Sequence, residues 1–125
     1  MSRAPRRSST RRPGPTPRRL PALSKHRLNE LVEEAIVDAH DVSEQLVGFL
    51  CMLEEHLTVP FTTQLLAMPV RVERIDINDA GDIVAICRRG AQRQQIALLD
   101  LPLPSPPPDG WEWVAAYRHW ARGGR

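Results

Sequence analysis

The sequence predicts an α+β fold, in which two N-terminal helices pack on a small antiparallel sheet and a short C-terminal helix closes the chain. Three observations predict this fold. Apolar residues recur at a helical spacing before Pro60, short β-rich runs follow from Phe61, and a last amphipathic segment ends near Ala121. We expect a sheet of four or so strands that either stays open or curls towards a small barrel. The 125 residues have room for one domain.

Residues 1–24 are predicted to be a disordered basic tail. The segment is rich in Arg, Ser, Thr and Pro, so it cannot bury enough apolar surface to offset the entropy lost on ordering. All nine charged residues up to Arg27 are basic. The rest of the chain holds eight basic and 15 acidic residues, a net charge of −7. We therefore expect a basic tail followed by one acidic domain at residues 25–125.

Two helices are predicted between the tail and Pro60. Apolar residues form a stripe of helical period from about Leu28 to Ala39, and acidic residues occupy the other face. Asp41, followed three residues later by Glu44, resembles a capping box. A second helix should therefore begin next to Asp41, near Val42, and end before the proline.

The next segment predicts strands joined by turns. The alternation of apolar and polar residues changes phase between residues 70 and 77, which predicts a β-bulge near Glu73–Arg74. Asn78–Gly81 has the composition of a turn, and Ile83–Cys87 is apolar on both faces, as a central strand would be. After another turn, we expect a strand from about Gln94 to Leu99.

The C-terminal part predicts an extended linker and a short helix. Leu101–Pro108 is rich in proline and should run along the surface. Asp109 and Glu112 repeat the capping-box spacing, so a helix is expected from there to about Ala121. Three aromatic residues with helical spacing are predicted to pack this helix on the sheet: Trp113, Tyr117 and Trp120.

The sequence does not predict an enzyme. It contains no G-x-S-x-G motif, no P-loop and no Rossmann glycine pattern, and its four histidines lack the spacing of a zinc site. Both cysteines, Cys51 and Cys87, lie in apolar runs and are expected to be free and buried. No run of apolar residues is long enough to span a membrane, and no signal peptide is recognisable. We expect a cytoplasmic binding protein.

The carboxylates are the candidate ligands. Glu34 and Asp38 lie four residues apart on the first helix, and Asp38, Asp41 and Glu44 surround the turn between the two helices. Like charges at this spacing repel each other, so a nearby cation would stabilise them. Calcium suits such a place because it takes six to eight oxygen ligands in flexible geometry. The alternative is a solvated acidic face of an ordinary helix.

A second acidic cluster lies in the predicted turn between strands. The run from Asp76 begins like an EF-hand loop, but Ala80 stands at the fifth position, and Cys87 stands where a bidentate Glu is required. This run is therefore not an EF-hand. It is a hairpin turn whose acids supply candidate oxygens for a weak second site, namely Asp76, Asp79 and Asp82.

The basic tail predicts a competing function. Clustered arginines bind phosphate backbones without sequence specificity, because they release condensed counterions. The tail contains no interleaved aromatic residues that would stack on bases. The alternative function is thus a protein- or nucleic-acid-interaction module that makes its contact through the arginine-rich tail.

Four stretches, in order along the chain, resemble a known family: LNELVEEAIVDAHDVSEQLVGFLCMLEEHLTVPF, VERIDINDAGDIVAICRRG, LLDLPLPSPPP and WVAAYRHWARG. Together they are similar to the small bacterial calcium-binding family typified by cyanobacterial CcbP. The resemblance implies a protein that binds Ca²⁺ through surface carboxylates without an EF-hand and acts as a calcium buffer or sensor. The matching acids are Asp38, Asp41, Glu44, Glu54, Glu55, Asp76, Asp79 and Asp82.

This chain departs from the family between the two helices. The family tends to be more acidic there, whereas this chain has Val42 and Ser43. Because fewer carboxylates weaken binding, we expect a dissociation constant for calcium on the order of 10⁻⁵ to 10⁻³ M. A downstream protein partner is not indicated by the sequence.

Overall fold

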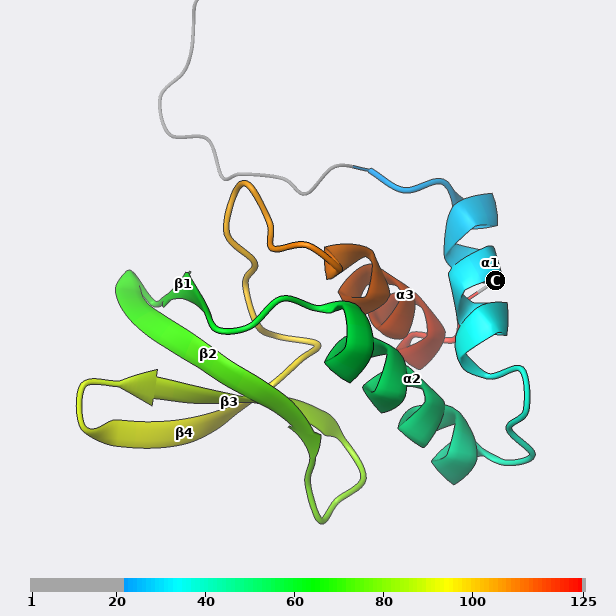
Figure 1. The fold of residues 1–125 in the computed structure, drawn as a ribbon, viewed down its shortest axis with the longest axis horizontal. Coiled ribbons are helices and arrows are strands. Elements are labelled where there is room, and N and C mark those ends of the chain that lie inside the picture. Colours follow the sequence, from blue (N-terminus) through cyan, green and yellow to red (C-terminus); the bar gives the residue numbers. More distant parts are fainter. Residues whose placement is uncertain (1–21, 125) are drawn as a thin grey trace, which may run out of the picture.

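The computed structural model describes residues 22–124, in which three helices lie on one side of a four-stranded antiparallel sheet (Figure 1). The strand order is β1-β2-β3-β4, so each strand pairs with its neighbours in the sequence. The predicted α+β fold is confirmed, and the sheet of the described residues is open rather than closed into a barrel. The elements are α1 (Lys25–Ala35), α2 (Val42–His56), β1 (Phe61–Leu65), β2 (Met68–Ile77), β3 (Ile83–Arg89), β4 (Gln92–Ala97) and α3 (Trp111–Ala121).

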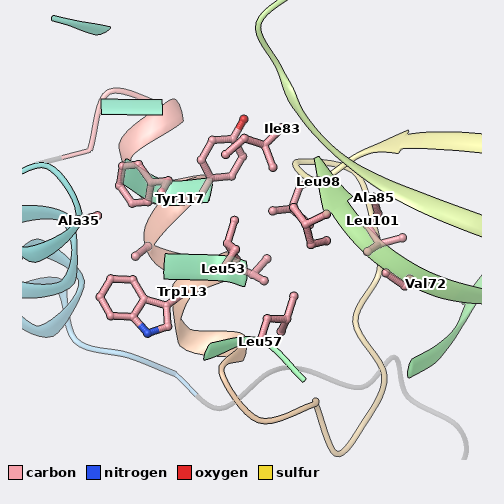
Figure 2. Packing of buried hydrophobic residues seen from close by; sticks show 14 of the residues in the cluster. Ala35, Leu53, Leu57, Val72, Ile83, Ala85, Leu98, Leu101, Trp113 and Tyr117 are labelled. Atoms are coloured by element: carbon pink, nitrogen blue, oxygen red, sulfur yellow. The ribbon is translucent and has the colours of Figure 1, made fainter. Parts of the chain in front are cut away.

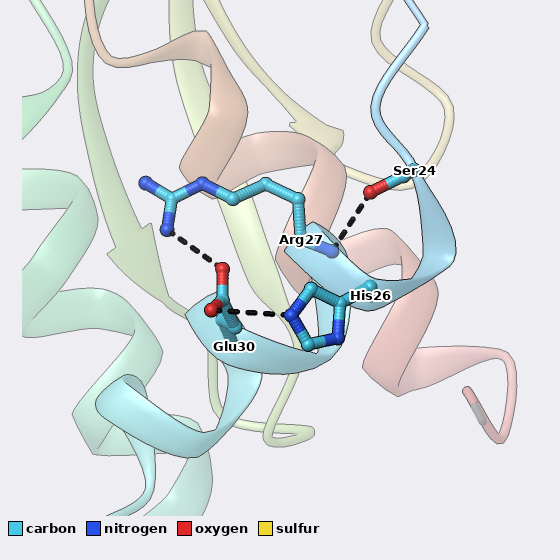
Figure 3. A network of polar contacts seen from close by, with 4 residues as sticks. All are labelled: Ser24, His26, Arg27 and Glu30. Carbon is cyan, nitrogen blue, oxygen red and sulfur yellow. Dashed lines mark hydrogen bonds and ion pairs between the residues drawn. The ribbon is translucent and has the colours of Figure 1, made fainter.

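Helix α1 begins three residues before the predicted start and ends four residues before the predicted end. Its N-cap is Ser24, whose hydroxyl oxygen accepts a hydrogen bond from the backbone N–H of Arg27 (3.0 Å; Figure 3). The helix stops at Ile36, because the chain must turn into an extended conformation at Asp41 before α2 can start. The part of the predicted tail that comprises residues 1–21 lies outside the described residues.

Helix α2 begins at the predicted position. The carboxylate of Asp41 accepts a hydrogen bond from the backbone N–H of Glu44 (2.8 Å), as an N-cap does. The Glu44 carboxylate reaches back to the N–H of His40 (2.6 Å), one residue before the N-cap. The predicted capping pair is therefore real, although its return hydrogen bond goes to His40 rather than to Asp41.

The sheet follows the predicted pattern of strands. The register of β2 against β3 shifts between Val72 and Arg74, which confirms the bulge. Strand β3 is buried from Ile83 to Cys87, as expected of a central strand. Strand β4 starts two residues earlier than predicted, because the hairpin from Arg89 to Gln92 has a loop of only two residues.

The predicted cap of α3 is wrong. The N-cap is Gly110 rather than Asp109, and no side chain caps this helix. Gly110 has a φ of 87°, and a Cβ at this position would overlap the backbone carbonyl of His56 at the end of α2. The carbonyl oxygen of Asp109 accepts a hydrogen bond from the N–H of Thr58 (2.9 Å). The close approach of this loop to α2 thus decides the start of α3.

The core fills the space between the helices and the sheet (Figure 2). Leu53 of α2 and Tyr117 of α3 lie on the helical side, and Ile83 and Ala85 of β3 lie on the sheet side. The ring of Phe49 packs edge-on against Tyr117, with 5.8 Å between the centroids. The aromatic stripe of α3 is therefore part of the core, as predicted, and it packs on α2 as well as towards the sheet.

Two further contacts attach α3 to the rest of the molecule. The guanidinium group of Arg118 donates hydrogen bonds to the carbonyl oxygens of Leu98 and Leu101, just after β4. The indole N–H of Trp120 donates to the side chain of Gln45 (3.0 Å). In residues 22–124, no helix has both the length and the apolar character needed to cross a membrane.

Candidate functional site

The best candidate site is a groove of about 500 Å³ between the end of α1 and the first turns of α2. Four acidic side chains line it, and none of the residues that line it is basic. These four residues are exposed, whereas Ala35, Gly48 and Met52 deeper in the groove are buried or half-buried. The acidic residues are Glu34, Asp38, Asp41 and Glu44.

The fold brings the first predicted set of ligands together around this groove. Glu34 stands in the last turn of α1, and Asp38 follows in the turn after it. Asp41 and Glu44 stand at the start of α2 because they cap that helix. The sequence pattern that predicted the cap and the pattern that predicted a cation site thus converge on the same carboxylates.

The arrangement of these carboxylates is not a preformed metal cage. Within residues 22–124, no group of three or more His, Cys, Asp or Glu side chains is positioned to hold a metal ion. One oxygen of Asp41 and one of Glu44 already accept backbone hydrogen bonds. The donor set suits calcium, which prefers oxygen ligands. Its side chains would have to converge before they could share an ion.

The second predicted set stays dispersed in the hairpin between β2 and β3. The carboxylate of Asp76 pairs with Arg74 (2.9 Å) and also accepts the N–H of Ile77 (2.8 Å). The turn is held by Asn78, whose side-chain oxygen accepts the N–H groups of Ala80 and Asp82, both at 3.0 Å. A side-chain-capped turn therefore explains this segment without a metal ion. Asp79 and Asp82 are exposed.

The two cysteines differ in their surroundings. Cys87 is completely buried, and burial, together with the charge of Glu73, raises the pKa of its thiol. A raised pKa is the opposite of what an activated nucleophile needs. Cys51 is exposed and lines the groove, so the expectation that both thiols are buried is wrong for this one. Cys51 lies on α2, five residues before His56, on a side of the helix that faces away from the core.

Sequence reasoning missed the apolar part of the groove. Val37 and Val47 line it and are 75% and 50% exposed, although apolar side chains of this size are usually buried. The available signal was that Val37 falls outside the apolar stripe of the predicted first helix, next to Asp38. Residues of this kind mark a surface that combines apolar contact with negative charge.

The chain matches no model of a protein family and no curated protein. Two solved structures share its fold. One is a calcium-binding protein in its calcium-binding form, with a TM-score of 0.63 and 22% identity over 83% of this chain and 99% of that chain. The other is CcbP from Anabaena, with a TM-score of 0.61 and 21% identity over 86% of this chain and 99% of that chain. The resemblance to the family typified by CcbP is thus confirmed at the level of the fold.

Proposed function

We propose that this chain is a calcium-binding protein without an EF-hand, which holds the ion through the exposed carboxylates of the groove between α1 and α2. The observation that carries this proposal is the gathering of four acidic residues, and no basic one, around a single groove. The shared fold supports it, because one of the two structural neighbours is a calcium-binding protein in its calcium-binding form. The candidate ligands are Glu34, Asp38, Asp41 and Glu44.

Weak binding fits this geometry. The carboxylates are exposed and not preorganised, so binding must order their side chains. A dissociation constant on the order of 10⁻⁵ to 10⁻³ M is expected. Such an affinity suits a cytoplasmic buffer or sensor. The acids of the hairpin, Asp76, Asp79 and Asp82, remain a prediction for a weaker second site.

A binding role also fits the thiols better than catalysis does. Cys87 is buried with a raised pKa, which is the opposite of what an activated thiol needs. We propose a protein that binds and releases ions rather than one that transforms a substrate. The arginine-rich tail as a contact for nucleic acid remains an alternative, and it lies outside the described residues.

The test is a calorimetric titration of the full chain with calcium, with magnesium as the control ion at the same ionic strength. We expect saturable heat with calcium. The double variant Glu34→Gln/Asp38→Asn should raise the dissociation constant at least about tenfold, which corresponds to about 1.4 kcal/mol. These two positions are chosen because neither side chain caps a helix.

The matched control is Glu54→Gln/Glu55→Gln, which removes two exposed carboxylates of α2 that do not line the groove. Its calcium affinity should stay close to that of the unmodified chain. Equal losses in both double variants would mean that calcium responds to overall charge, and the groove would then not be the site. An absence of saturable heat up to millimolar calcium would reject the function itself.

A further inference from the structure

The groove combines two properties, and a small cation needs only one of them. Its lining is acidic, but it also includes the exposed apolar side chains of Val37 and Val47 and the half-buried Met52. A bare ion makes no use of apolar surface, whereas a peptide with long cationic side chains uses both kinds of contact. Arginine side chains place their methylene groups on apolar surface and their charged ends on carboxylates.

The chain itself contains such a peptide. Residues 1–21 hold seven arginines and no acidic residue. Four prolines follow Arg12 in this segment. The seven arginines are Arg3, Arg6, Arg7, Arg11, Arg12, Arg18 and Arg19. Because this segment lies outside the described residues, we infer its position from its charge and from the length of the chain.

The acid nearest to the segment is already paired. At the start of α1, Glu30 lies within 3.3 Å of Arg27 and 3.4 Å of His26 (Figure 3). One turn further, Glu34 and then Asp38 form no ion pair with any residue from 22 to 124. Glu33, also on α1, is exposed and forms no ion pair within these residues either, but it does not line the groove. The segment would therefore meet unpaired carboxylates at Glu33 and at the groove.

The segment is long enough to reach the groove. Helix α1 has 11 residues, so about 16 Å separates the N-cap Ser24 from the groove at the other end of the helix. An extended chain of 21 residues spans up to about 70 Å. This length is more than sufficient for Arg11 and Arg12 to contact the groove. A covalent tether also holds the segment at an effective concentration on the order of millimolar.

We propose that the groove between α1 and α2 is the docking surface for the chain's own arginine-rich segment, residues 1–21. The arginines pair with Glu34 and Asp38, and their methylene groups and the prolines cover Val37 and Val47. The inference goes beyond calcium binding, because it assigns a second occupant to the same groove. The segment and the cation would compete for the same carboxylates.

The test places a nitroxide label on the segment and reads its position by NMR without calcium. The full chain carries Ser8→Cys for the label and Cys51→Ser to remove the exposed thiol of the groove, while Cys87 is buried. In a chelator-treated buffer of about 0.01 M salt, where the Debye length is about 30 Å, we expect broadening of the amide signals of Asp38, Val47 and Gly48. The signals of β4 should stay sharp.

Two comparisons make the result specific. Adding Glu34→Gln/Asp38→Asn should abolish the broadening at the groove, whereas the control Glu54→Gln/Glu55→Gln should leave it unchanged. Salt of about 1 M, with a Debye length of about 3 Å, should also remove it. Broadening spread evenly over the surface, or insensitive to the groove variant, would overturn the proposal.

A second copy of the chain is the competing occupant. Isotope-labelled protein without a nitroxide, mixed with unlabelled protein that carries it, reports only contacts between molecules. Sharp signals in this mixture support docking within one chain, and broadening at the groove would reject it. Because calcium is absent throughout, failure of this experiment leaves the calcium titration untouched, and failure of the titration leaves this result untouched.

Discussion

At the scale of single residues, the Asp41 carboxylate caps α2 and is also a proposed calcium ligand. One oxygen accepts the N–H of Glu44 and caps α2, and the residue also lines the groove proposed to hold calcium. A cap needs a hydrogen-bond acceptor, whereas a calcium ligand benefits from a full negative charge. Asparagine retains the acceptor and lacks the charge, so substitution can separate the two roles.

Substituting Asp41 should therefore give different results for stability and for calcium affinity. Asp41→Ala removes the cap and should lower the free energy of unfolding by about 1 kcal/mol, whereas Asp41→Asn should change it by only a few tenths. Both variants should weaken calcium binding by a similar factor. Urea unfolding and calorimetry measure the two quantities. Unchanged calcium affinity in Asp41→Asn would remove this carboxylate from the site.

At the scale of elements, the groove depends on how closely α1 and α2 approach each other. Gly48 of α2 lies against the end of α1, and a Cβ at this position would overlap the backbone carbonyl of Ala35. A glycine inside a helix costs about 1 kcal/mol relative to alanine. Gly48 thus permits the close contact between the two helices, although it lowers the helix propensity of α2.

Gly48→Ala should lower the free energy of unfolding by about 1–3 kcal/mol, because the overlap with Ala35 outweighs the gain in helix propensity. The control is Val47→Ala, which changes an exposed neighbour on the same helix and should have a small effect. Urea unfolding of both variants compares them. A stabilised Gly48→Ala protein would show that the two helices can separate at no cost.

At the scale of the whole molecule, Tyr117 connects the helical layer to the sheet. It lies on α3, packs against Phe49 of α2 and lies close to Ile83 of β3 (Figure 2). Burial raises the pKa of its phenol, a backbone hydrogen bond at Ile83 lowers it, and the charge of Asp82 raises it; the net direction is upward. The folded state therefore favours the neutral phenol.

The pH dependence of stability follows from this direction. A raised folded pKa means that the stabilisation is complete below the unfolded pKa of about 10 and is lost as the pH rises through the folded pKa. Cys87, whose pKa is raised in the same direction, should add to this loss above about pH 9. We expect urea midpoints to fall between pH 9 and about pH 11.

The contribution of Tyr117 can be isolated because it is the one tyrosine of the chain. The stability of the unmodified chain relative to Tyr117→Phe should be greatest at pH 7, where the phenol is neutral. The difference should shrink as the pH rises, because the phenylalanine cannot ionise. Tyrosinate absorbance gives the titration of this residue directly. A difference that is independent of pH, or an unshifted titration, would contradict this prediction.

Local patterns in the sequence determine the types and the order of the elements. The helical stripe, the cap at Asp41, the bulge beside Val72 and the doubly buried strand β3 each depend on residues a few positions apart. Backbone hydrogen bonding and the period of burial act over that range. Most of the fold could therefore be predicted from the sequence alone.

The tertiary structure decided the ends of the elements and the composition of the site. Gly110, rather than Asp109, starts α3 because this loop meets the end of α2, and Asp76 is paired with Arg74, two residues before it on the same strand. The groove exists because Gly48 lets α2 approach α1, which places four carboxylates and Val37 around one opening. The sequence alone identified three of these acids as one cluster and placed the fourth beside them. The physical reason for this difference is that a groove is made by the distance between two helices, and no local pattern encodes that distance.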